Sequence, residues 1–163
     1  MAIKDALLAE YDHEMGTTRK LLERLPEDKL AWKPHEKSMA LGQLAKHLGN
    51  ISQWAGSILN DSSFDLSALP PDQDVTQSRG EVLEAFDAAT KTARASMDKT
   101  DAEYMAMWSL KRGDQEIFSM PRVAVFRSFV LNHVIHHRGQ LSVYLRLNNI
   151  PVPAIYGPTA DEG

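Results

Sequence analysis

The sequence of 163 residues contains no cysteine. A disulfide framework and a cysteine nucleophile are therefore both excluded, and any thiol chemistry would need a thiol supplied from outside the chain. Long apolar runs are also missing, because no stretch approaches the roughly 18 residues that would cross a bilayer. We therefore expect no association with a membrane, and we take the cytoplasm as the expected compartment.

Positive charge is in slight deficit. Lys and Arg number 18 against 22 Asp and Glu, which gives a formal net charge of -4. This balance provides no long-range attraction to a phosphate backbone, so we expect no nucleic-acid partner. The sequence also contains neither a phosphate-binding glycine loop nor a GxSxG motif. With 43% hydrophobic residues, its length predicts a single domain over residues 1–163.

Apolar residues recur with helical periodicity in four stretches, 3–25, 39–59, 78–98 and 121–147. Residues 60–77 show no sustained period and are too many for a tight turn between helices, which predicts a long crossover connection. These features predict an all-α protein, a four-helix bundle with one crossover. In residues 107–118, apolar residues flank a polar turn at Gly113, which predicts a short β-hairpin before the last helix.

Three histidines fall on the apolar stripes of two predicted helices. His133 and His137 are four residues apart, so a helix places both rings on one face, one turn from each other. His47 lies in the apolar stripe of another predicted helix. Burying imidazole nitrogens is costly unless they find partners, and a metal ion would satisfy one nitrogen of each ring. Bundles build metal sites from inward-facing side chains of neighbouring helices, so the pattern predicts a divalent-metal site at His47, His133 and His137.

The other histidines and two carboxylates fit this site less well. His136 is turned by about 100° around the helix from His137. This favours exposure to solvent, a place in an interface or a contact with a metal-ligating side chain over direct coordination of the same ion. His13 and His35 are expected to lie outside the site. Glu10 and Glu14, on the first predicted helix, are as compatible with a solvated face as with a base or a fourth ligand, so neither is assigned.

The segment Asn132–Leu141, NHVIHHRGQL, resembles the signature in the last helix of the DinB family, also called the DinB/YfiT-like metalloenzymes. The segment Leu44–Leu48, LAKHL, is similar to the histidine motif in that family's second helix, and Pro153–Pro158 resembles the C-terminal tail of one branch. The resemblance implies an up-down-down-up helix order and a metal site formed by the same three histidines, commonly with zinc or nickel. It also implies a homodimer.

The resemblance further implies an activity. Some members are transferases or isomerases that use a low-molecular-weight thiol such as mycothiol, bacillithiol or glutathione. We therefore expect a metal-dependent thiol transferase, in which the ion activates a small thiol for attack on an electrophilic small-molecule substrate; catalytic and thiol-binding residues stay unassigned. Three alternatives remain open: a metal-dependent hydrolase, a non-catalytic metal-binding or stress-response protein, and an interaction module whose histidines hold no ion.

Overall fold

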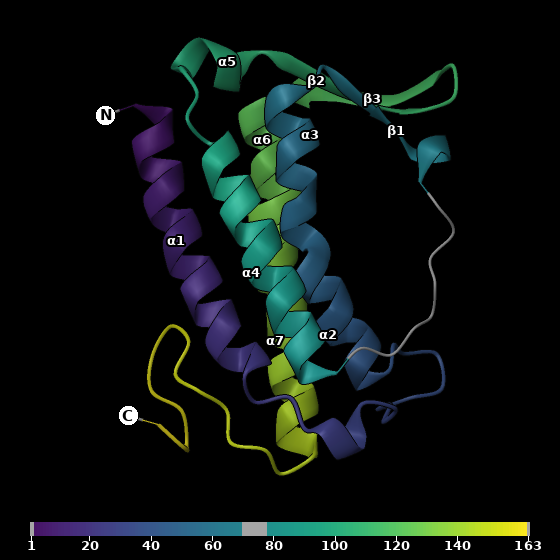
Figure 1. Ribbon diagram of the computed structural model, residues 1–163, viewed down its shortest axis with the longest axis vertical. Coiled ribbons are helices and arrows are strands. Elements are labelled where there is room, and N and C mark those ends of the chain that lie inside the picture. Colours follow the sequence, from purple (N-terminus) through teal and green to yellow (C-terminus); the bar gives the residue numbers. More distant parts are fainter. Residues whose placement is uncertain (1, 70–77, 163) are drawn as a thin grey trace.

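The computed structural model describes residues 2–69 and 78–162 of the chain. The protein is mostly helical, as predicted, with a small three-stranded sheet at one end of the helices (Figure 1). The long helices lie side by side. The first and the last of them run in one direction, while the two helical segments between them run in the other. None of the described helices is long and apolar enough to cross a membrane.

The first and third predicted helices are α1, Ile3–Leu22, and α4, Arg79–Ser96. Both lie close to their predicted bounds, although α1 ends before the predicted residue 25. Ser78 fixes the start of α4, because its hydroxyl accepts a hydrogen bond from the backbone N–H of Glu81 (3.2 Å). The Glu81 carboxylate in turn accepts from the N–H of Ser78 (2.8 Å). This reciprocal cap satisfies N–H groups that the first turn of a helix leaves without partners.

The second predicted helix, 39–59, is interrupted in the structure. It consists of α2, Leu41–Asn50, a 3₁₀ turn at Ile51–Gln53, and α3, Trp54–Asn60. The apolar side chains that the three pieces bury include Leu44, Leu48, Ile51, Ala55 and Ile58. A 3₁₀ turn is tighter than an α turn, so it changes the helical phase between α2 and α3.

The last long helix changes its hydrogen-bond pattern along its length. The helix α6, Arg122–Phe126, leads into a π-helical turn at Arg127–Leu131, which is followed by α7, Asn132–Leu147. A π turn is wider than an α turn, so residues after it point in directions that a single α-helical period does not predict. Such turns are frequent at functional sites, and this one directly precedes the two predicted ligands on α7.

The predicted β-hairpin is confirmed, but the sheet is larger than predicted. Its strands are β1, Ser63–Asp65, β2, Met107–Arg112, and β3, Gln115–Pro121, in the order β1-β2-β3. The strands β2 and β3 pair antiparallel around Gly113, whose φ of 58° suits glycine, whereas β1 pairs parallel with β2. The strand β1 was not predicted and lies inside the expected crossover 60–77, of which residues 70–77 lie outside the described residues.

Packing among the long helices determines where a site can form. The helix α1 packs against α4 and α7, and α2 packs against the same two helices. Large side chains fill the core, among them Tyr11, Phe86, Trp108 and Phe126. The other short elements are 3₁₀ turns at Glu27–Lys29 and Leu66–Ala68 and the helix α5, Asp101–Met105. The contact between α2 and α7 joins the two predicted helices that carry the candidate metal ligands.

Candidate metal centre

One candidate ligand comes from α2. His47 lies between Leu44 and Leu48, and each of these two side chains is almost fully buried (1% exposed). Because these neighbours pack into the core, the ring of His47 lies at the edge of the contact between α2 and α7 and is half-buried. The apolar stripe that predicted the orientation of α2 therefore also directs this histidine.

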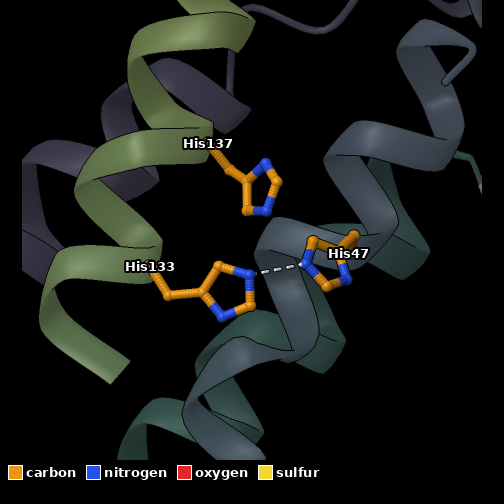
Figure 2. A group of neighbouring side chains, drawn as sticks. All are labelled: His47, His133 and His137. Carbon is orange, nitrogen blue, oxygen red and sulfur yellow. Dashed lines mark hydrogen bonds between the residues drawn. The ribbon is translucent and has the colours of Figure 1, made fainter. Parts of the chain in front are cut away.

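The other two candidate ligands come from α7, one turn apart. The rings of His133 and His137 face His47, as Figure 2 shows, with centroids 5.0 and 4.6 Å from the His47 ring. The Nε2 atoms of His47 and His133 are 3.1 Å apart. One nitrogen from each of the three rings lies within 4.8 Å of the others. The structure thus brings together all three histidines that the sequence predicted.

The donor set fits a divalent metal ion. Imidazole nitrogens bind zinc at about 2.0–2.1 Å, so three of them in a tetrahedral site lie about 3.3 Å from one another. The Nε2 atoms of His47 and His133 are already near this separation, and a nitrogen of His137 lies within 4.8 Å of the nitrogens of both other rings. Imidazole ligands suit zinc, nickel, copper and iron alike, so the donor set does not select one metal.

Hydrogen bonds orient the rings on α7. The Nδ1 atom of His137 lies 2.8 Å from Oε1 of Gln140, one helical turn further along. If Nδ1–H donates to this amide oxygen, Nε2 keeps its lone pair for a metal. His133 makes a hydrogen bond to the backbone of Phe129, which has the same effect on its own ring.

Burial makes these rings better ligands. It lowers the pKa of His133 below the ordinary value of 6.5, and the nearby charge of His137 acts in the same direction. Burial likewise lowers the pKa of His137, against the opposing effect of its hydrogen bond to Gln140. Since a metal binds only the neutral imidazole, a lowered pKa keeps both rings available near pH 7.

Comparison with known proteins decides the family. The sequence model of the DinB family matches residues 1–163. The chain belongs to the DinB family. Over 158 residues it is 25% identical to the protein YrdA of Bacillus subtilis (strain 168), an alignment that covers 97% of this chain and 90% of that protein.

Two crystal structures of DinB-like proteins have the same fold as this DinB chain. The protein from Bacillus cereus ATCC 10987 has a TM-score of 0.71 and 21% sequence identity, with 95% of this chain and 98% of that chain covered. The protein YjoA from Bacillus subtilis has a TM-score of 0.71 and 20% identity, with 93% of this chain and 99% of that chain covered. At these identities the likeness concerns the fold alone.

The remaining histidines of this DinB chain lie outside the three-histidine group, as predicted. His136 is exposed to solvent, although its ring lies beside that of His137 with centroids 4.8 Å apart. His13 stacks on Tyr156 on the surface, and His35 accepts a hydrogen bond from a backbone N–H in an exposed segment. Neither of these two rings belongs to the group that could hold an ion.

The carboxylates of α1 are engaged elsewhere. Glu10 forms an ion pair with Arg127, with 2.7 Å between nitrogen and oxygen. Glu14, which the sequence left unassigned, turns inward and is buried (6% exposed), but it pairs with the guanidinium of Arg138 at 2.6 Å. Neither carboxylate is therefore a member of the candidate metal group.

Arg138 is the main residue whose role the sequence did not reveal. It is buried (1% exposed) and donates to the backbone oxygen of Glu14 (3.1 Å) and to the hydroxyl of Thr18 (3.3 Å). The hydroxyl of Tyr156, in the C-terminal tail, lies 2.5 Å from the same guanidinium and donates to the Glu14 carboxylate. Because Arg138 follows His137 directly, this network fixes the rotation of α7 at the point where the metal group is attached.

A pocket opens beside the histidine group. It has a volume of about 280 Å³, and His47 forms part of its wall together with residues of the 3₁₀ turn, of α3 and of the first strand region. Trp54 and Phe64 supply its aromatic wall, with ring centroids 5.0 Å apart. The volume is at the small end of the range for sites that bind small molecules. His47 is thus both a candidate metal ligand and part of the wall of a pocket that could hold a small molecule.

Proposed function

We propose that this DinB chain holds one divalent metal ion, zinc or nickel, on His47, His133 and His137 and uses it to activate a low-molecular-weight thiol for transfer to an electrophilic small molecule. The observation that carries the proposal is the convergence of three imidazoles from two packed helices. Three protein ligands leave a coordination position open, which is typical of catalytic sites and unlike closed structural ones.

The protein groups around the histidines support this role. A divalent ion there would supply an acid strong enough to convert a coordinated thiol into its nucleophilic thiolate near neutral pH. The chain has no cysteine of its own, so the thiol comes from solution. Gln140 and the backbone of Phe129 hold the rings of His137 and His133 in place, and half-burial limits the access of water.

A metal-dependent hydrolase is the alternative activity. Such a mechanism is assisted by a general base close to the attacking water. Among the described residues, no carboxylate joins the three histidines in the metal group. Glu10 is paired with Arg127 and Glu14 with Arg138, so the two carboxylates that the sequence offered are occupied. These contacts favour a thiol nucleophile over an activated water.

Thiol dependence tests the proposal directly. Protein loaded with zinc or nickel is assayed with an aryl halide and, in turn, with mycothiol, bacillithiol, glutathione or no thiol. We expect turnover only with a thiol, loss of turnover in His47→Ala, and retention of it in His136→Ala, the neighbour that lies outside the metal group. Turnover that is independent of every thiol would contradict the transferase and support the hydrolase.

Elemental analysis separates these enzymes from the non-catalytic readings. Protein purified without an affinity tag should contain close to one metal ion per chain, and a cobalt-substituted form should change its absorption spectrum when the thiol is added. One ion per chain without any spectral change would support a non-catalytic metal-binding protein. A metal content far below one would support an interaction module. The expected homodimer stays a prediction, which light scattering during size-exclusion chromatography would test.

A further inference from the structure

The pocket beside His47 carries an inference about the substrate. We propose that it binds the electrophilic partner of the thiol, and that this partner is a small, uncharged and largely apolar molecule, preferably aromatic, with a single polar oxygen. This inference rests on the proposed function for its chemistry, but its binding part can be tested without metal and without turnover.

The apolar character of the pocket comes from four side chains. Ile51, Trp54, Phe64 and Leu69 line it. The rings of Trp54 and Phe64 meet edge to face with an interplanar angle of 65°. The ring of Phe129 also packs against that of Trp54, with 6.0 Å between the centroids, which restrains the indole. A rigid aromatic wall of this kind favours flat apolar ligands, because aromatic rings gain stacking or edge contacts in addition to burial.

The charge of the pocket excludes ionic ligands. None of the described residues that line it is an Asp, Glu, Lys or Arg, and its polar side chains apart from His47 are neutral amides and a hydroxyl. The amide of Gln53 donates to Asn50 (2.7 Å), and the amide of Asn50 donates to the backbone oxygen of Lys46 (3.0 Å). In the metal-free protein, a charged ligand would lose its hydration here without gaining an opposite charge from an acidic or basic lining residue, so the pocket itself selects neutral molecules.

One polar side chain in the wall, Ser57, indicates that the ligand carries an oxygen. The hydroxyl of Ser57 is buried and makes no hydrogen bond within the part of the chain that the structure describes. Buried hydroxyls almost always have a partner, so an exception needs a reason. Ser57 lines the pocket, and rotation about its one side-chain torsion is the movement by which its hydroxyl can reach a bound molecule. A carbonyl or hydroxyl oxygen of the ligand would then be its partner.

The position of the pocket relates it to the metal group. His47 belongs to both, so a molecule that fills the pocket lies next to the place where the thiol would be held. Reactions between two bound molecules gain most when the reacting atoms are held side by side. The pocket therefore fits the electrophile, while the open position on the ion fits the thiol.

Binding of four matched probes tests the inference. Toluene, benzyl alcohol, benzoate and benzylamine are titrated into metal-free protein, so that benzoate cannot bind an ion, and the indole N–H signal of Trp54 is followed by NMR. We expect millimolar binding of toluene and benzyl alcohol, and binding of the two charged probes weaker by about tenfold or more. The zinc-loaded protein is then titrated with the two neutral probes and should bind both.

Two serine variants test the hydroxyl. Replacing Ser57→Ala should weaken benzyl alcohol about three- to tenfold, the usual effect of one hydrogen bond, and leave toluene unchanged. The control is Ser142→Ala, on an exposed part of α7, which should change neither probe. Trp54→Ala should remove binding of both probes, which is followed in this variant by NMR of the probe signals because the indole is gone, and its folding is checked by circular dichroism and by an unchanged zinc content.

Each outcome has a defined meaning. The inference is overturned if no probe shifts the Trp54 signal, if charged and neutral probes bind equally, or if Ser57→Ala weakens toluene and benzyl alcohol alike. Probe binding as expected, together with absent metal or absent thiol-dependent turnover, would overturn the proposed function and leave the pocket standing. Thiol-dependent turnover without probe binding would overturn the inference about the pocket and leave the proposed function standing.

Discussion

The Nε2 atoms of His47 and His133 lie 3.1 Å apart across the contact between α2 and α7. Two imidazole lone pairs at this distance repel each other unless a proton or a cation lies between them. In the metal-free protein one of the two nitrogens donates its proton to the other. A metal ion would replace that proton and include His137 as well, so the site links two helices that are 86 residues apart at these positions.

Metal binding should therefore stabilise the folded chain. At a free zinc concentration about 100 times the dissociation constant, we expect the free energy of unfolding to rise by about 2.7 kcal/mol. The measurement is urea unfolding with and without zinc. His47→Ala and His137→Ala should abolish the gain, while His136→Ala, at an exposed neighbour, should keep it. An equal gain in His47→Ala would remove this residue from the site.

The hydrogen bond between His137 and Gln140 predicts a loss of metal affinity on mutation. Gln140→Leu removes the acceptor that fixes the Nδ1 proton of His137, and such changes usually lower metal affinity about 10- to 100-fold. Gln140→Glu keeps an acceptor and should retain the affinity. Competition with a chromophoric chelator measures both. If Leu and Glu variants bind zinc alike, Gln140 does not orient the ring.

The buried ion pair of Glu14 and Arg138 predicts a large effect on stability. Removing one partner leaves an uncompensated charge in the core, so Arg138→Met should lower the free energy of unfolding by about 3–5 kcal/mol. Replacing both, with Glu14→Leu and Arg138→Met, should cost less than the single change, because no buried charge is left. Urea unfolding of the metal-free variants gives these values.

A second ion pair serves as the control for this prediction. Arg94 and Asp12 form a bidentate pair on the surface, where both side chains are about half exposed. Its disruption by Arg94→Met should lower the free energy of unfolding far less than Arg138→Met does, because water screens the charges. Similar losses in Arg94→Met and Arg138→Met would mean that burial does not strengthen the inner pair.

The candidate site could be predicted because its information is local. The spacing of His133 and His137 places two rings on one helix face, and the stripe around His47 directs the third ring inward. The hairpin turn at Gly113 is likewise encoded within a few residues and is confirmed. The third predicted helix, which was expected to begin at residue 78, begins at Arg79 in the structure. The family resemblance implied a metal site at the same three histidines, independently of their periodicity.

The features that were missed depend on distant contacts or on a changed helical period. Glu14 and Arg138 are 124 residues apart, so no local pattern predicts that they pair. The parallel pairing of β1 with β2 is similarly non-local. On the last helix, the structure buries both Val125 and Phe126 just before the π turn, an adjacent pair that a single helical period does not single out. The contact of His137 with Gln140, by contrast, has a helical i, i+3 spacing from which it was predictable.

The lowered pKa of His133 and His137 predicts how the metal-free protein responds to acid. Both groups bind protons less readily when folded than at their ordinary value of 6.5. The unfolded chain therefore binds more protons below pH 6.5, and the free energy of unfolding is highest above that pH and falls as the pH drops through the folded pKa values.

Urea unfolding between about pH 8 and pH 5 measures this slope. The double variant His133→Asn/His137→Asn should flatten the curve in that window, since asparagine does not titrate. An unchanged slope would mean that these two rings are protonated equally well in both states, and that burial does not hold them in the neutral form that a metal requires.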